Sequence, residues 1–267
     1  MSKRTILIIS LTFIGLAFLQ SCGNETANST DPTTELNKEY VPNKNEIAFE
    51  EKMAAIDANQ NFQKGNSLFY SRADGASVDV ELFIDSNNAV VKMVERYTNS
   101  ATQSVCSNVF YLENNKKFAS RELFEYASKD SLSFSERISY YDKKDKPIVT
   151  KMKTAYFEDE LDYESFSIVE NHDCSIQRAI NVINQTGEYV TTFRGFVKED
   201  PYLYMIVGEN DNKGYSSSLV VQMMTSTIKK LQLNEDKMIG APLTVEFQTL
   251  DDSQGFVYQM LNSAHIR

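Results

Sequence analysis

Apolar and polar residues alternate with a period of two through the middle of the chain, which is typical of half-buried β-strands. From Ser77 the apolar positions fall at every second residue: Val78, Val80, Leu82 and Ile84. The polar cluster Asp85–Asn88 follows them. An aromatic residue stands just before such a polar turn three times, at Phe83, Tyr111 and Tyr140, with successive separations of 28 and 29 residues. Three hairpin units of nearly constant length predict an antiparallel meander of about six strands.

Beyond Gly187 the alternation returns in a second pattern. Strands are predicted near Tyr189–Val197, Tyr202–Gly208, Tyr215–Met224, Leu243–Leu250 and Phe256–Asn262. A short helix, Ser226–Leu231, is predicted between the third and fourth of them. This order resembles that of the OB-type five-stranded small barrels, a family that often binds oligonucleotides or oligosaccharides on one face. An SH3-like barrel or a two-sheet sandwich is the alternative.

Two more helices are predicted from helical spacing and capping residues. Asn43 and Glu46 have the spacing of a capping box, and apolar residues at helical intervals extend the helix over Glu46–Gln63. A further helix is predicted from Asp173 up to Gly187. The predicted fold class is therefore mainly β (β-rich α+β): a meander, a C-terminal OB-like or SH3-like small barrel, and two or three short helices.

The first residues of the chain have the layout of an export signal. Lys3 and Arg4 precede the apolar run Ile6–Leu19, and Leu19-Gln20-Ser21-Cys22 follows. A membrane-spanning helix needs about 20 apolar residues, whereas the core of a signal peptide needs about 7–15. The segment resembles the bacterial lipoprotein signal with its lipobox. The resemblance implies that Cys22 is the first mature residue and carries the lipid chains that hold the protein on a membrane. An uncleaved membrane anchor is the alternative.

Four regions follow from these patterns. Residues 1–21 are the predicted signal peptide, and residues 22–43 are the lipidated cysteine and a flexible tether that is poor in large apolar residues, with a reach of roughly 25 Å. Residues 44–185 are predicted to form a helix-plus-meander domain, and residues 186–267 the small barrel. In lipoprotein sorting of the enterobacterial type, Gly23 after the lipidated cysteine favours the outer membrane over the inner one. Which leaflet the body faces stays open.

The charge of the chain narrows the range of partners. The formal net charge is −10, and it becomes −12 once residues 1–21, which hold two basic residues and no acidic ones, are removed. A body this acidic repels nucleic acid and anionic lipid headgroups. The predicted partners are therefore the membrane, through lipidated Cys22, and an envelope protein or glycan.

Two cysteines remain beside Cys22. In an oxidising export compartment, Cys106 and Cys174 can form a disulfide, which would contribute about 4 kcal/mol on the chain-entropy model. The alternative is a pair of separate buried thiols, which behave as small apolar residues.

Short motifs give no assignable chemistry. The acidic run Glu158–Asp162 can bind a hard cation or form a solvated turn, and Glu209–Gly214 resembles a calcium loop but reads better as a hairpin turn. His172-Asp173-Cys174 offers a thiol and an imidazole beside each other, with a turn as the alternative. Ser226–Lys229 matches Ser-x-x-Lys without its companion motifs. No catalytic residue, metal site or cofactor is predicted.

The sequence favours a non-enzymatic, lipid-anchored cell-envelope protein of the binding or assembly type. A periplasmic carrier or binder of an apolar ligand or a glycan is the first alternative, because Phe and Tyr are dense between residues 69 and 166. An envelope hydrolase acting on carbohydrate is a further alternative, because paired carboxylates leave no spacing signature.

Overall fold

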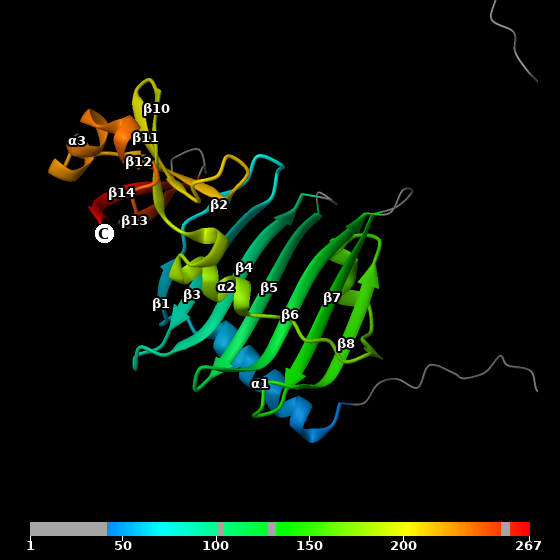
Figure 1. The fold of residues 1–267 in the computed structure, drawn as a ribbon. Helices are drawn as coiled ribbons and strands as arrows, with labels where there is room; N and C mark the ends of the chain where they lie inside the picture. The colour runs from blue at the N-terminus through cyan, green and yellow to red at the C-terminus, as the bar shows by residue number, and fades with distance from the viewer. Residues whose placement is uncertain (1–41, 101–103, 128–131, 252–256) are drawn as a thin grey trace, which may run out of the picture. The chain divides into compact units, whose positions relative to one another are not determined.

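Hairpin-connected strands dominate the computed structural model, which describes residues 42–100, 104–127, 132–251 and 257–267. Seven successive strands pair with their chain neighbours in antiparallel order (Figure 1). They are β3 (Ser77–Ile84), β4 (Val90–Asn99), β5 (Ser104–Glu113), β6 (Lys116–Ala127), β7 (Leu132–Tyr141), β8 (Pro147–Ala155) and β9 (Ser167–Val169). The mainly β class is thus confirmed, and the predicted meander of about six strands corresponds to β3–β8. The lipobox, Cys22 and the tether up to residue 41 lie outside the described residues.

The turns of the meander have the local chemistry that the sequence indicates. The Asp85 carboxylate accepts hydrogen bonds from two backbone N–H groups of its own turn, at 2.8 and 2.9 Å. Asp142 does the same in the third hairpin, at 2.7 and 3.0 Å. In these two turns Asn88 and Asp145 adopt left-handed backbone conformations, with φ of 62° and 59°. Asn and Asp tolerate that conformation better than other non-glycine residues, so the turn sequence fixes the register of the flanking strands.

Helices cover opposite faces of the meander. Phe110 and Tyr111 are neighbours on β5 and therefore point to opposite faces. Tyr111 packs in a cluster with Met53 of α1 (Lys44–Ala58), whereas Phe110 belongs to the larger cluster that includes α2 (Gln177–Asn184). Each face of the central strands is thus buried under a helix, and Figure 1 shows both helices crossing the sheet.

The first helix begins at the predicted capping box, with Lys44 rather than Glu46 as its first residue, and it ends earlier than predicted. The Asn43 side chain accepts from the backbone N–H groups of the first turn, and the Glu46 side chain accepts from the Asn43 N–H, which completes the capping box. The predicted end at Gln63 is wrong, because the helix stops at Ala58. The Asn59 side chain caps the following turn instead, and β1 (Gln63–Asn66) pairs with β3.

The C-terminal part has the predicted order of three strands, a helix and two strands. We call strands β10–β14 the OB-like strands; they pair in the order β10-β11-β12-β14-β13. Only the β12–β14 pair is parallel among these five. The elements are β10 (Thr192–Glu199), β11 (Tyr202–Gly208), β12 (Ser216–Val221), α3 (Ser226–Leu233), α4 (Glu235–Met238), β13 (Leu243–Asp251) and β14 (Val257–Ile266).

The ring formed by these strands is left partly open. An isolated antiparallel bridge joins Thr192, at the start of β10, to Pro242, just before β13. The backbone N–H of Leu243 also donates to the carbonyl of Thr191 at 2.9 Å. No ladder joins β10 to β13 in the described residues, so the sheet is not closed. The OB-type expectation therefore holds for element order, whereas a fully closed barrel is not what the structure has.

Strands from both sides of the predicted boundary at residue 186 belong to one 14-stranded sheet. The link is β2 (Tyr70–Ser71), which pairs with β3 on one side and, through Ser71 and Ser216, with β12 on the other. The Gln259 side chain of β14 also accepts from the Phe69 N–H at 2.8 Å. The boundary itself falls between α2 and η2 (Gly187–Tyr189), and the division into two domains stays a prediction.

Candidate functional site

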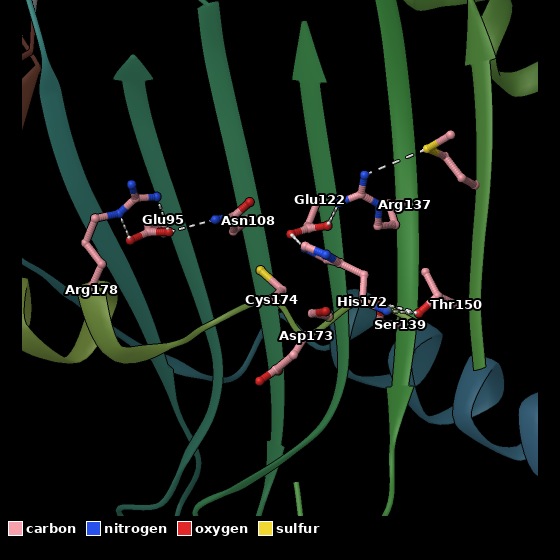
Figure 2. A network of polar contacts seen from close by, with 12 residues as sticks. Glu95, Asn108, Glu122, Arg137, Ser139, Thr150, His172, Asp173, Cys174 and Arg178 are labelled. Carbon is pink, nitrogen blue, oxygen red and sulfur yellow. Dashed lines mark hydrogen bonds and ion pairs between the residues drawn. The ribbon is translucent and has the colours of Figure 1, made fainter. Parts of the chain in front are cut away.

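A row of polar side chains crosses the α2-covered face of the meander. Glu95, Asn108, Glu122 and Arg137 lie directly opposite one another on β4, β5, β6 and β7. We call these four residues the polar row; Figure 2 shows them side by side. They occupy positions at which an alternating strand normally places apolar residues, so each of them needs a partner to offset its desolvation.

Glu95 is fully buried and has two partners. Arg178 of α2 donates to both carboxylate oxygens, at 2.7 and 2.9 Å, and Asn108 donates to one of them at 2.8 Å. The Arg178 guanidinium also lies 3.6 Å from the ring centroid of Tyr97. Burial acts to lower the pKa of Arg178, but the hydrogen bonds and charge of Glu95 outweigh burial and raise that pKa above its ordinary value. The pair is thus a fixed ionic contact between α2 and the sheet.

Glu122 is the second buried carboxylate of the row. Arg137 donates to it at 2.9 Å, and Nε2 of His172 lies 3.2 Å from its other oxygen. Burial and the neighbouring Glu122 carboxylate raise the pKa of the Cys174 thiol well above its ordinary value. An arginine, an imidazole and a thiol therefore converge on one carboxylate (Figure 2).

His172 and Cys174 belong to an irregular segment, residues 170–176, that crosses the sheet just before α2; we call it the strap. The backbone N–H of His172 donates to the Thr150 hydroxyl at 2.9 Å, and that of Cys174 donates to the Tyr141 hydroxyl at 3.0 Å. Lys117 binds the Asp173 carboxylate at 2.7 Å and the Cys174 carbonyl. These sheet contacts hold the segment extended, which is why the helix predicted from Asp173 begins only at Gln177.

The geometry of the strap disfavours nucleophilic chemistry at Cys174. A catalytic cysteine needs a lowered pKa and a base in contact with its sulfur. Here the pKa of the thiol is raised, the residue is buried, and His172 contacts Glu122. Cys106 is buried as well, with its sulfur 3.9 Å from the Ser104 hydroxyl. Both cysteines are free thiols in the structure, so the disulfide between Cys106 and Cys174 is not formed there.

The other short motifs lie in surface turns and helix ends. Ser226 and Lys229 are exposed in the first turns of α3. Residues 209–214 form the β11–β12 hairpin turn, in which Asp211 accepts from the Lys213 N–H at 3.0 Å. The acidic run lies in η1 (Glu158–Tyr163). Across the described ranges, no three His, Cys, Asp or Glu side chains are grouped closely enough to hold a metal ion.

Two of the three aromatic residues in the repeat pattern pack inside the protein. Tyr111 and Tyr140 are buried beside α1, and Phe49 stacks on Tyr140 with 5.6 Å between ring centroids. Tyr97 lies under Arg178. Tyr156 differs, because 72% of its surface is exposed. The buried aromatic residues of the meander are thus packing partners, as cross-strand aromatic pairs usually are.

A separate polar cavity of about 460 Å³ lies between β2 and the OB-like strands. Its lining includes Arg72, Arg194 and Glu235. Arg194 donates to the Asn212 side chain at 3.1 Å, and Glu235 accepts from the Phe196 N–H at 2.7 Å. The latter bond is formed at a β-bulge that includes Gly195, whose φ is 130°. A Cβ atom at Gly195 would lie 2.9 Å from the Glu235 carboxylate, so a larger residue would disturb this bond.

Two tyrosines extend this polar surface along β11. Tyr202 and Tyr204 are two residues apart, so they point to the same face, and their ring centroids are 6.2 Å apart. Tyr204 is paired in register with Val197 and Val220 on the neighbouring strands. Tyr202 is 54% and Val197 is 45% exposed. Val197 also lines the cavity, so the strand face that carries the tyrosines continues into it. Tyrosine rings and guanidinium groups can bind a flat or cyclic polar ligand through stacking and hydrogen bonds.

Sequence reasoning missed the buried ion pairs, since Arg178 and Glu95 are 83 residues apart. The one available signal was the phase of the alternation, because Glu95 occupies an inward position between Met93 and Tyr97. Comparison with known proteins found no family model, curated protein or solved structure that matches the chain. None of the described helices has the length and apolar character needed to cross a membrane.

Proposed function

We propose that this chain is a non-enzymatic, lipid-anchored cell-envelope protein of the binding type, held on a membrane through Cys22. The anchor rests on the lipobox and the short apolar run before it. The binding role rests on one observation: the cavity lined by Arg72 and Arg194 also includes Val197, which is paired in register with Tyr204 of β11, two residues from the exposed Tyr202. The ligand that fits this surface best is a glycan, because tyrosine faces stack on sugar rings and guanidinium groups donate to hydroxyl and carboxylate oxygens.

The polar row supports a non-enzymatic role. Its two carboxylates, Glu95 and Glu122, are each bound by an arginine, and the nearby thiol is held protonated. A glycoside hydrolase needs one carboxyl group free to protonate the leaving group and another free to attack or to activate water. Neither condition is met by these two carboxylates. The buried aromatic residues likewise count against a carrier of apolar ligands in the meander, since packing already occupies them.

The anchor is tested by fractionation and acyl labelling. Cells expressing the full chain or its Cys22→Ala variant are fed a palmitate analogue and then separated into membrane and soluble fractions. The wild type should carry the label and sediment with the outer membrane, and Cys22→Ala should lose both properties. A Cys22→Ala protein that is exported, unlabelled and still fully membrane-bound would contradict the lipid anchor.

The binding role is tested with a glycan array probed by the full chain in detergent. Hits are then measured in solution by tyrosine fluorescence, since the chain contains no Trp. Tyr202→Ala and Arg72→Gln should weaken the hit by about tenfold, the effect of losing one stacking or charge-assisted contact. Tyr156→Ala, an exposed tyrosine elsewhere, serves as the matched control. An array without hits would remove the glycan as ligand.

A further inference from the structure

The segment that follows β8 exposes three aromatic residues in succession. Tyr156 is 72%, Phe157 is 63% and Tyr163 is 89% exposed. The segment is nevertheless held in place, because Leu161 of η1 is only 4% exposed and η1 contacts both β7 and β8. A fixed group of exposed aromatic rings is unusual on a protein without a partner and marks surfaces that bind other molecules.

A cavity of about 570 Å³ is lined in part by Glu158 and Asp162, the chain neighbours of Phe157 and Tyr163. Leu123 and Leu161 contribute apolar surface to its lining. On its β6–β7 side Arg121 is paired with Glu136 at 3.1 Å, and Glu136 also binds Lys153 at 3.0 Å. The η1 side of the cavity carries Glu158, Asp159 and Asp162. The cavity therefore combines an apolar part with a carboxylate rim.

These carboxylates have no counter-ions of their own. Between residues 154 and 171 the chain has six acidic residues and neither Lys nor Arg. Among the described residues, none of the six takes part in an ion pair. They are Glu158, Asp159, Glu160, Asp162, Glu164 and Glu170. This surface is thus a local concentration of negative charge, which favours a cationic partner.

The charge and the apolar lining of the η1 cavity favour one kind of ligand over the others. A bare metal ion does not fit, because no three acidic side chains of the described part are grouped closely enough to hold one. An anionic membrane surface would be repelled by the carboxylates. A second copy of the same body, with a net charge of −12 after signal removal, would be repelled as well. A lysine or arginine side chain fits, since its alkyl stem packs on leucine while its head binds carboxylates and aromatic faces.

We infer that the surface formed by Tyr156, Phe157, Tyr163 and the η1 cavity is a docking site for a cationic polypeptide segment of another envelope protein. A basic side chain of that segment enters the cavity between Leu123 and the η1 carboxylates, and neighbouring side chains lie on the exposed rings. This surface lies on the meander elements β6–β9, so the inference stands whether or not the OB-like strands bind a glycan.

Binding is measured as the fluorescence anisotropy of a labelled decalysine peptide, with the full chain in detergent. The charge variant Glu158→Gln/Asp159→Asn/Asp162→Asn should bind the peptide about tenfold more weakly, since three exposed ion pairs are lost. The matched control Glu51→Gln/Glu199→Gln/Asp236→Asn changes the net charge equally at exposed positions elsewhere. It should bind like the wild type. Equal weakening in both triple variants would show attraction by net charge alone and would overturn the site.

A second pair of variants tests the aromatic part at constant charge. Tyr156→Ala/Tyr163→Ala should weaken decalysine binding, whereas Tyr258→Ala, at a tyrosine of β14 that is 37% exposed, should not. Unchanged binding by the double variant would overturn the proposal. Sedimentation of the same proteins, alone and with anionic phospholipid vesicles, tests whether a second copy of the chain or a lipid surface binds there instead. A wild-type dimer that Tyr163→Ala separates, or vesicle binding lost in Tyr163→Ala, would assign the surface to a second copy or to lipid instead.

Discussion

At the scale of single residues, the two buried carboxylates of the polar row explain why the strap stays on the sheet. Glu95 holds Arg178 of α2, and Glu122 holds His172 of the strap. A buried ion pair adds little compared with apolar packing, but removing one partner leaves the other desolvated and uncompensated. Both carboxylates therefore act through their partners on the segment that covers the meander.

Replacing Glu95 with Gln should destabilise the protein by about 2–4 kcal/mol, because the Arg178 charge is left without its counter-ion in a largely buried setting. Lys64→Gln is the control, since Lys64 pairs with Glu81 while 62% of its own side chain stays exposed. That change should cost less than about 1 kcal/mol. Urea unfolding of both variants measures the difference, and equal costs would show that the Glu95 pair adds nothing beyond a surface contact.

Cys174 should make the free energy of unfolding decrease at alkaline pH. Burial first, and the Glu122 carboxylate second, raise the pKa of this thiol above its ordinary value of 9.0. Above pH 9 the unfolded chain therefore loses a proton that the folded protein retains, and the free energy of unfolding falls as the pH rises. Below pH 9 the thiol is protonated in both states, so its full contribution to stability is present there and is lost only as the pH rises.

Urea unfolding at pH 8, 9 and 10 tests this effect. Once the unfolded thiol is ionised, the loss approaches about 1.4 kcal/mol per pH unit, and it should be smaller in Cys174→Ala. Counting the reactive thiols in denaturant without reductant tests whether Cys106 and Cys174 are free. Two reactive thiols besides Cys22 are expected, whereas none would show that Cys106 and Cys174 form the disulfide after all.

At the scale of elements, the apolar side chains of α1 hold this helix on the face of β5–β7 that lies opposite α2. Met53 is 3% exposed in the cluster with Tyr111, Phe118 and Tyr140. The Glu50 carboxylate adds a polar tie, because it accepts from the Tyr140 hydroxyl at 3.1 Å. Packing of one buried stripe thus fixes the helix that follows the predicted tether.

Met53→Ala should lower the free energy of unfolding by about 2–4 kcal/mol, the usual cost of truncating a buried methionine. Ile47→Ala on the same helix is the control. Ile47 is 44% exposed, so the change should cost less than about 1 kcal/mol. Chemical unfolding followed by far-UV circular dichroism gives both values. Similar losses in the two variants would mean that α1 is not docked through Met53.

Local patterns predicted the elements well because their causes are local. The period of two, the Asp85 and Asp142 turns and the Asn43 cap depend on residues within a few positions of one another. Contacts between distant segments left no such signal. The strap position, the Arg178–Glu95 pair and the pairing of β2 with β12 each join segments far apart in the sequence.

The candidate surfaces were predictable only in part. The acidic run Glu158–Asp162 stood out in the sequence, but the exposure of Tyr156 and Tyr163 beside it is a property of the fold. The same holds for the cavity that brings Arg72 of the meander side to Arg194 of β10. One sequence does not reveal which aromatic residues face solvent, because core and surface tyrosines look alike in an alternating strand.

At the scale of the whole molecule, the central question is whether the meander and the OB-like strands unfold together. They share one sheet, and the described residues between 42 and 267 form one compact unit by their contacts. The Tyr70 hydroxyl donates to the Tyr189 carbonyl at 2.7 Å, and the Gln259 side chain donates to the Ser67 carbonyl at 2.9 Å. Buried bonds of this kind couple the two parts.

Calorimetry of the full chain should therefore show one unfolding transition for the body. Met53→Ala in the meander cluster and Leu219→Ala in the OB-like strands should both shift that same transition to lower temperature. Two transitions that respond separately to the two variants would instead establish the boundary at residue 186 as a division between independent domains.

The position of β2 has a consequence for how the protein is made. A chain that emerges N-terminus first can form the hairpins of β3–β8 as soon as each neighbour appears. The outer side of β2 must wait for Ser216, more than a hundred residues later. Closing such a distant contact is slow, and an unpaired strand edge can pair with other chains in the meantime. The outer edge of β2 therefore stays unpaired from the synthesis of β2 until β12 has emerged.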